Sequence, residues 1–130
     1  MPQRARSDLP YLAPSEWQVF YVLSKRGPLT IQEIGRELVG MNPDFKAGYT
    51  TLLSYAQRLI RKGYVHQKRL AGPTTAHTYS AVVPFNFALR RQIERFFAEF
   101  IFDDPESLRT LRQLAEDHVA VSALTKPRPT

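Results

Sequence analysis

The sequence contains no cysteine among its 130 residues. This absence excludes a disulfide framework, a thiolate metal site and a cysteine nucleophile. Three histidines are present, His66, His77 and His118, and their positions show no metal-ligand spacing. His66 and His77 could face each other across a hairpin, where a polar pair is expected rather than a metal site. We therefore expect no metal and no other cofactor.

Long hydrophobic runs are also missing. The most apolar stretch, Phe96 to Phe102, is interrupted by Glu99 and is far shorter than the roughly 20 residues that span a bilayer. The chain shows no positively charged start followed by an apolar run of signal-peptide length. We expect a cytoplasmic protein that does not associate with a membrane.

Patterns that carry catalysis are absent as well. We find no paired carboxylates, no activated nucleophile and no glycine-rich loop that could hold a phosphate. The composition, 43% hydrophobic and 23% charged, is ordinary for a folded soluble protein. The sequence therefore does not favour an enzyme.

Acidic residues are scarce in the first half of the chain. Residues 1–70 hold 11 lysines and arginines against 5 aspartates and glutamates, whereas residues 71–130 hold 7 of each class. The net charge of +6 therefore belongs to the first half, and no acidic residue occurs between Asp44 and Glu94. A basic region joined to a neutral one favours a polyanion-binding domain in the first half of the chain and a region with a different function in the second half. Charge that merely keeps the surface soluble is the simpler alternative.

Two helices with start signals are predicted near the beginning of the chain. In "PSEWQVFYVLSKRGP", Ser15 can cap a helix while Gln18 reaches back to it, and a Gly-Pro pair ends the helix. In "LTIQEIGRELVG", Thr30 and Glu33 repeat this pattern, and Gly40 is expected to end the second helix.

A third helix and a hairpin follow. Apolar residues recur at helical spacing in "AGYTTLLSYAQRLIRKGYV" until Gly63. Two strand candidates, "YVHQKR" and "HTYSAV", are separated by the loop "LAGPTTA". This order predicts a mainly α fold with a small β-hairpin, a winged helix-turn-helix. We expect a flexible arm over 1–12, the winged domain over 13–84, a helical dimerisation region over 85–120 and a loose tail over 121–130.

The third helix has two different faces. At about 100° per residue, Leu52, Ala56 and Leu59 share the inward side, and hydroxyl, amide and guanidinium side chains lie opposite. Such groups can bond base edges in a major groove or neutralise phosphates, and neighbouring cations would extend the surface. An ordinary solvated face is the alternative. The predicted DNA-binding residues are Lys46, Thr50, Thr51, Ser54, Gln57, Arg58, Arg61, Lys68 and Arg69.

The C-terminal third carries a wide apolar stripe at helical spacing, followed by a last helix that starts at Asp104-Pro105. The stripe could fold back on the winged domain, but a neutral helical pair beside a domain with its own core favours self-association. The predicted dimerisation residues are Leu89, Ile93, Phe96, Phe97, Phe100, Ile101, Leu108 and Leu111.

Three stretches together form a specific pattern: "LAPSEWQVFYVLSKRGPLTIQEIGREL", "YTTLLSYAQRLIRKGYV" and "HTYSAVV". Their most telling residues are Glu16-Trp17, Glu33-Ile34, Tyr49-Thr50-Thr51, Arg58-Leu59, Lys62-Gly63 and Tyr79-Ser80. On these residues the sequence resembles, over roughly residues 12 to 117, the penicillinase-repressor (BlaI/MecI) family. The resemblance implies a winged-helix repressor, dimeric through its C-terminal helices, that binds a palindromic operator, with Thr50 and Thr51 on the operator-contacting helix.

Departures from the family pattern concern the inducing signal. Copper-responsive relatives carry a cysteine-rich tail, which this chain lacks. Penicillinase-type members are cleaved in the C-terminal region, at an Asn-Phe junction in well-known cases, when a membrane sensor is triggered. The corresponding stretch "SLRTLRQLAED" has no Asn-Phe. An inducing protease or sensor remains a candidate partner that the sequence does not identify.

These observations predict a sequence-specific transcriptional repressor that binds a palindromic double-stranded DNA operator as a homodimer. A winged helix used as a protein-protein adaptor, without specific DNA binding, is the alternative. Its binding would be insensitive to salt and to loss of the outward cations, whereas DNA binding depends strongly on both.

Overall fold

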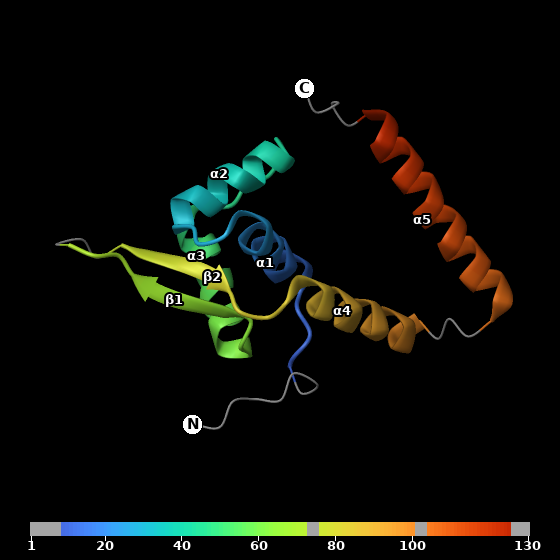
Figure 1. The fold of residues 1–130 in the computed structure, drawn as a ribbon, viewed down its shortest axis with the longest axis horizontal. Helices are drawn as coiled ribbons and strands as arrows, with labels where there is room; N and C mark the ends of the chain where they lie inside the picture. The colour runs from blue at the N-terminus through green and yellow to red at the C-terminus, as the bar shows by residue number, and fades with distance from the viewer. Residues whose placement is uncertain (1–8, 73–75, 101–103, 126–130) are drawn as a thin grey trace. The chain divides into compact units, whose positions relative to one another are not determined.

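The computed structural model describes residues 9–72, 76–100 and 104–125. Along this part of the chain the order is α1 (Pro14–Arg26), α2 (Ile31–Met41), α3 (Tyr49–Lys62), β1 (Val65–Arg69), β2 (His77–Ala81), α4 (Phe85–Phe100) and α5 (Pro105–Thr125) (Figure 1). The predicted mainly helical fold with a two-stranded hairpin is confirmed. The chain divides into two compact units, Met1–Gln92 and Ile93–Thr130, which are described separately.

Helix α1 begins two residues earlier than a cap at Ser15 predicts. Its N-cap is Ala13, and Pro14 occupies the first helical position, where a missing N–H has no cost. Glu16, rather than Gln18, reaches back, because its Oε1 accepts the Ala13 N–H at 2.8 Å. Ser15 therefore lies inside the first turn and does not cap the helix.

Helix α2 has the predicted start but a different end. Thr30 Oγ1 accepts the Glu33 N–H at 3.2 Å, and Glu33 Oε1 accepts the Thr30 N–H at 3.0 Å. The backbone bond from Thr30 lowers the pKa of the Glu33 carboxyl below its ordinary value. The helix continues through Gly40 to Met41 and is capped at Asn42, whose N–H donates to Leu38 at 2.9 Å. The prediction of an end at Gly40 was wrong, because this glycine has no positive φ.

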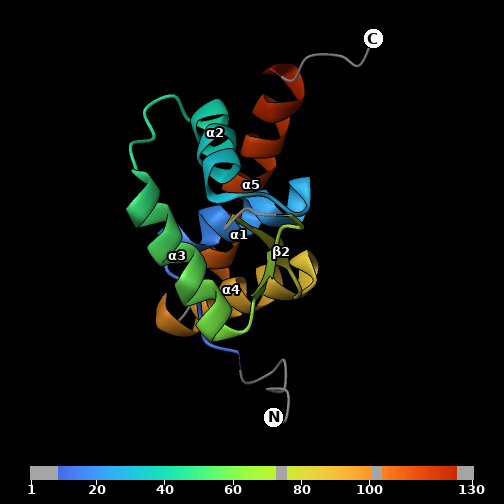
Figure 2. The same cartoon turned by 90° about the vertical axis from the view of Figure 1, so that its left-hand side faces the viewer.

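The core of the first unit lies between helices α1, α2 and α3, which all contact one another, and the hairpin (Figure 2). Helices α2 and α3 approach closely at Gly35, where an added Cβ would lie 3.2 Å from Leu52 Cδ1. The two helices are therefore close enough here that a larger side chain would require Leu52 to shift by a few tenths of an ångström. The buried apolar residues are Leu9, Leu12, Val19, Phe20, Val22, Leu23, Leu29, Ile31, Ile34, Leu38, Leu52, Ala56, Leu59, Tyr64, Val65, Tyr79, Val83 and Ala88.

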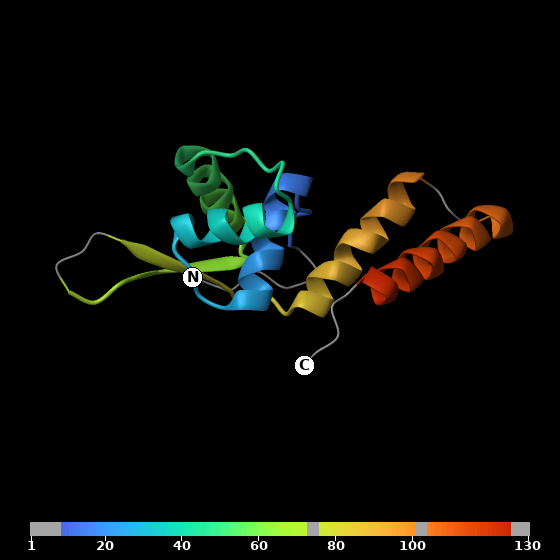
Figure 3. The same cartoon turned by 90° about the horizontal axis from the view of Figure 1, so that it is seen from above.

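The hairpin is antiparallel and extends from the three helices (Figure 3). Its register places His66 opposite Ser80 and Arg69 opposite His77, so the two histidines are not the cross-strand pair that the sequence suggested. A loop residue between α1 and α2 adds a short bridge, since Leu29 and Tyr79 exchange backbone hydrogen bonds of 3.1 and 2.8 Å. This bridge attaches the hairpin to the start of the helix-turn-helix.

Residues 9–12, named here the N-terminal strap, differ from the flexible arm expected over 1–12. Leu9 and Leu12 are buried in the core of the first unit. The Tyr64 hydroxyl donates to the Pro10 carbonyl at 2.6 Å, and burial raises the pKa of this hydroxyl. Burial of these two leucines orders the strap, and no periodic pattern in the local sequence predicts it. Residues 1–8 of the expected arm lie outside the described residues.

The division between the units falls within α4, after Gln92, rather than before Phe85 as expected. Ala88 is buried, and Gln92 bonds to the N-terminal strap, so the first turns of α4 pack as part of the winged unit. Helix α5 starts as predicted, because Asp104 Oδ1 accepts the Ser107 N–H at 2.6 Å. It reaches Thr125, beyond the predicted limit of 120 and into the expected tail, whose residues 126–130 lie outside the described ranges.

Candidate nucleic-acid interface

Helix α3 presents the two faces that its sequence predicts. Leu52, Ala56 and Leu59 are buried against the other helices, with exposures of 3%, 0% and 0%. On the other side Ser54 is half-buried, and five predicted contact residues are exposed: Thr50, Thr51, Gln57, Arg58 and Arg61. The exposed groups are hydroxyl, amide and guanidinium, all of which can bond base edges or phosphate oxygens.

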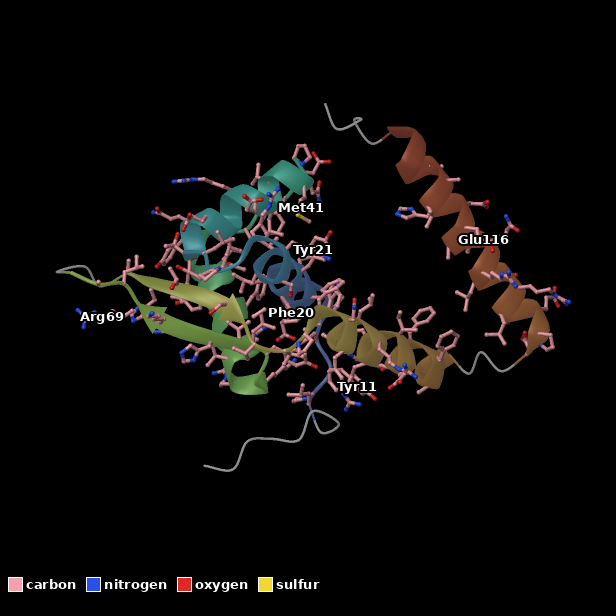
Figure 4. The ribbon with its side chains drawn as sticks, viewed as in Figure 1. Tyr11, Phe20, Tyr21, Met41, Arg69 and Glu116 are labelled. Carbon is pink, nitrogen blue, oxygen red and sulfur yellow. The ribbon has the colours of Figure 1, made fainter. Side chains whose placement is uncertain are left out.

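Cations flank this helix. Lys46 precedes α3 and is exposed, and Lys68 and Arg69 are exposed on β1. Arg69 lies toward the loop end of the hairpin (Figure 4). Each of the nine predicted DNA-binding residues is thus at least partly accessible, and they lie on α3, on β1 and in the connection before α3.

The C-terminal end of α3 is fixed by a glycine cap and a buried ion pair. Gly63 has φ +88°, the left-handed conformation that closes a helix, and the Tyr64 N–H donates to Leu59 at 3.0 Å. Lys62 Nζ lies 2.6 Å from Oε1 of Glu16, a carboxylate that is only 2% exposed. Neighbouring cations therefore differ in role: Lys62 joins α3 to α1, whereas Arg61 is exposed to solvent.

A polar hollow of about 290 Å³ lies where the starts of α2 and α3 meet β2. Tyr49, at the first position of α3, is 57% exposed beside it. Sequence reasoning did not select Tyr49 or Gln32 as site residues, because helical periodicity places each on its own helix and not beside the other. The lining residues are Thr30, Ile31, Gln32, Tyr49, Ala76, His77 and Tyr79.

The apolar stripe of α4 and α5 remains largely solvent-exposed within the chain. Exposure of its large residues ranges from 37% at Leu89 and Phe97 to 45% at Ile93, with Phe96 and Leu108 both at 41%. Leu111 is half-buried. The Phe100 side chain and the whole of Ile101 lie outside the described residues. Three residues that the sequence did not select, Leu114, Val119 and Val121, are more exposed still, at 60%, 66% and 58%.

Other kinds of site find no support in the described residues. In residues 9–72, 76–100 and 104–125, no group of three or more histidine or acidic side chains could hold a metal ion. Over the same residues, none of the helices combines the length and apolarity needed to cross a membrane. The basic face of α3 and its flanks is the functional surface that the described residues support best.

The first unit combines three helices, a residue before the second helix that bridges to the hairpin, and a two-stranded wing. With a basic polar face on the third helix, this arrangement defines a winged-helix transcription regulator. The chain belongs to the penicillinase repressor family, whose model matches residues 12–122. The resemblance inferred from sequence motifs is confirmed. Among curated proteins, none matches the sequence.

Solved structures share the fold. The complex structure of hsRosR-S4 has a TM-score of 0.56 at 22% identity, covering 91% of this chain and 99% of that one. A structure of RosR from H. salinarum has a TM-score of 0.55 at 18% identity, with 88% and 99% covered. The YusO protein from Bacillus subtilis has a TM-score of 0.54 at 16% identity, with 89% and 77% covered. At these identities the likeness concerns the fold alone.

Proposed function

We propose that this chain is a sequence-specific transcriptional repressor that acts as a homodimer on a palindromic DNA operator in the cytoplasm, without catalytic activity. Family membership supports the general role of transcription regulator. The finer parts of the proposal rest on the residues of α3 and of the apolar stripe.

One observation carries the proposal: the exposed face of α3 has hydroxyls, an amide and arginines but no acidic residue. The sequence holds no aspartate or glutamate between Asp44 and Glu94, a stretch that includes α3 and the whole hairpin. An ordinary solvated helix mixes acidic and basic side chains, whereas a face that approaches phosphates excludes carboxylates because of like-charge repulsion. Gln57 and Arg61 are the residues we assign to base edges.

The homodimer is supported by the exposed stripe of large apolar side chains on α4 and α5. Contiguous exposed apolar surface of this kind marks an interface in soluble proteins. A two-fold dimer would present two α3 helices to half-sites separated by about one DNA turn, roughly 34 Å, which predicts a palindromic site. Because linking two weak modules raises the overall affinity, disruption of the dimer would release the DNA.

The first test is selection of bound duplexes from random DNA by the full chain, followed by footprinting on its own promoter at a stated salt concentration. We expect a two-fold symmetric sequence and an affinity that falls steeply with salt. Recovery of no preferred sequence, with binding to protein partners that is insensitive to salt, would instead favour the adaptor. A reporter driven by the footprinted promoter should be lowered by the protein; increased expression would contradict repression.

The second test separates base contacts from phosphate contacts. Arg61→Ala and Gln57→Ala should each weaken binding to the selected duplex by about 1–3 kcal/mol, with a smaller loss on random duplexes. Arg26→Ala is the matched control, since it removes an exposed arginine from α1 that pairs with Glu37 at 3.2 Å. Equal losses on selected and random DNA would show that Gln57 and Arg61 contact only phosphates.

A further inference from the structure

The polar hollow at the start of α3 is lined by a buried tyrosine whose hydroxyl forms no hydrogen bond within the described residues. Tyr79 of β2 is 4% exposed and lines the hollow. Its backbone exchanges hydrogen bonds with Leu29, but no group in the described part of the chain bonds its hydroxyl. A buried tyrosine hydroxyl usually has a partner. The hydroxyl of Tyr79 is therefore available to a group that enters the hollow from outside the chain.

A second hydroxyl and other neutral polar groups line the same hollow. The hydroxyl of Tyr49, at the first position of α3, likewise forms no hydrogen bond with the described residues. Burial raises the pKa of Tyr79 above its ordinary value, with a smaller contribution from Tyr49, so its hydroxyl remains an O–H donor at neutral pH. Gln32 and His77 can each add a side-chain N–H. The lining is thus rich in hydrogen-bond donors, and it contains no carboxylate.

The start of α3 adds backbone donors beside these side chains. Its N-cap is Gly48, which has no side chain to accept a hydrogen bond, and its first turn has no acidic residue. The first N–H groups of a helix have no partner within the helix and form the positive end of its dipole, which attracts anions. Helix α2 differs, because Thr30 caps it and Glu33 places a carboxylate in its first turn. The uncapped start of α3 therefore favours an anion close to Tyr49.

The position of the hollow indicates which anion would reach it. The hollow lies between predicted DNA-binding residues of two elements. Tyr49 directly precedes Thr50 and Thr51 in α3, and His77 pairs in register with Arg69 of β1. A duplex that contacts both elements would bring its backbone to the hollow. Phosphate oxygens commonly accept hydrogen bonds from tyrosine and glutamine side chains, from backbone N–H groups and from helix N-termini.

We infer that the polar hollow binds a phosphate of the DNA backbone, through the hydroxyls of Tyr49 and Tyr79 and the N–H groups at the start of α3. The inference rests on the proposed function and deepens it, because it adds a contact that positions α3 on the duplex without reading a base. All the groups involved belong to the first unit, so one copy of the chain contains the whole site. Free phosphate has the same chemistry, and the experiments below distinguish it from the DNA backbone.

Tyr79→Phe removes the buried hydroxyl and keeps the ring. The full chain with this substitution should bind selected and random duplexes about tenfold more weakly, because a hydrogen bond to a charged group is lost on either DNA. The salt dependence should keep its slope, since no cation is removed. Tyr21→Phe is the matched control, at a partly exposed tyrosine of α1 that does not line the hollow, and it should bind as before. Tyr49→Phe, at an exposed side chain, is the second variant should Tyr79→Phe fail to fold, which circular dichroism establishes.

A duplex with a single altered phosphate tests the contact itself. A methylphosphonate replaces one phosphate oxygen by a methyl group and removes the charge. When this change is placed at each backbone position of the selected site in turn, the unchanged protein should lose about tenfold in affinity at the position that meets the hollow. At that position Tyr79→Phe should lose about threefold or less, because the hydroxyl that bonds the oxygen is already absent. A purely structural role of Tyr79 would leave the two losses equal.

Two results would overturn the inference and leave the proposed function intact: unchanged DNA binding by folded Tyr79→Phe and Tyr49→Phe, or equal methylphosphonate losses at every position. Calorimetric titration of inorganic phosphate into the full chain without DNA tests the other source of phosphate. Uptake that is lost in Tyr79→Phe, without any coupling to the DNA backbone, would assign the hollow to free phosphate and also overturn the inference. Absence of DNA binding by the unchanged protein would overturn the proposed function and the inference together.

Discussion

The two units of this chain bury their apolar residues differently. In the first unit, eighteen apolar side chains from Leu9 to Ala88 are buried in one core. In the second, none of the residues from Ile93 to Val121 whose side chains are described is buried. The ion pairs show the same contrast. In the second unit Arg95–Glu99 and Arg112–Glu116 are exposed pairs, each within one helix, whereas Glu16–Lys62 joins two helices of the first unit.

The contrast teaches where each unit gains its stability. The first unit removes its large apolar side chains from water within one chain, so its folding is intramolecular. The second unit leaves Phe96, Phe97 and Leu114 at 41%, 37% and 60% exposure, and exposed pairs of neighbouring charges add little. In our proposal the missing burial is supplied by a second copy, and each prediction below tests one side of this contrast.

The largest effect is expected where the second unit depends on a partner. Phe97→Asp should convert the dimer to monomers at micromolar concentration, because it places a charge of equal sign in both halves of a two-fold interface. Light scattering measures the change, and Phe97→Leu, which keeps an apolar side chain, should stay dimeric. A dimer that survives Phe97→Asp would show that the assigned stripe is not the interface.

Next in size is truncation within the core of the first unit. Phe20 is 0% exposed and packs edge-on against Tyr64 at 5.5 Å between ring centres. Phe20→Ala should lower the free energy of unfolding by about 3–5 kcal/mol, independently of protein concentration. Chemical denaturation at several concentrations checks this. The matched Phe97→Ala should instead show a loss that depends on concentration; identical behaviour of both variants would remove the contrast between the units.

The buried ion pair of the first unit should come third. Lys62→Met leaves the Glu16 carboxylate buried without its cation, although the Ala13 N–H still donates to it. Loss of one partner of a buried ion pair lowers the free energy of unfolding by several kcal/mol. Because Lys62 is 28% exposed, we expect a smaller decrease of about 2–3 kcal/mol, measured by urea unfolding. Arg112→Met, which breaks an exposed pair in α5, should cost less than about 0.5 kcal/mol. An equal decrease in the free energy of unfolding for both variants would show that burial of Glu16 does not make its ion pair more important for stability.

Helix caps give the smallest effect, and each unit has a helix whose N-cap side chain accepts a backbone N–H, Thr30 in the first and Asp104 in the second. Thr30→Ala should destabilise the first unit by about 1 kcal/mol through loss of the cap to Glu33. Hydrogen bonds lower the pKa of Glu33 in α2 and of Asp104 at α5. Each carboxylate therefore stabilises the folded state above its unfolded-state pKa, and this contribution is lost as the pH falls through the lower folded-state pKa.

The acid limb of the stability curve tests this sign. Between pH 5 and pH 2, chosen as a range about the ordinary carboxyl pKa values of 4.5 for Glu33 and 3.8 for Asp104, Glu33→Gln should unfold with a shallower pH dependence than the unchanged chain. An unaltered slope in Glu33→Gln would show that the cap bond to Thr30 is not retained in solution.

Local signals in the sequence predicted much of the fold and of the candidate site. The box of Thr30 and Glu33, the glycine cap at Gly63 and the two faces of α3 each depend on residues of a single helix and its ends. Such patterns express the geometry of a single helix or hairpin, so one chain segment contains all the information. For this reason the exposed positions of Gln57 and Arg61 could be assigned before any tertiary contact was known.

Only the tertiary structure decided which residues far apart in sequence meet. The strap contacts of Leu9 and Leu12 with Arg91 and Gln92 span about eighty residues, and Glu16 finds Lys62 across 46 positions. The register that separates His66 from His77 likewise follows from the pairing of whole strands. Long-range contacts form where burial and hydrogen bonding together outweigh the entropy of closing a loop, and that balance has no signature in a short stretch of sequence.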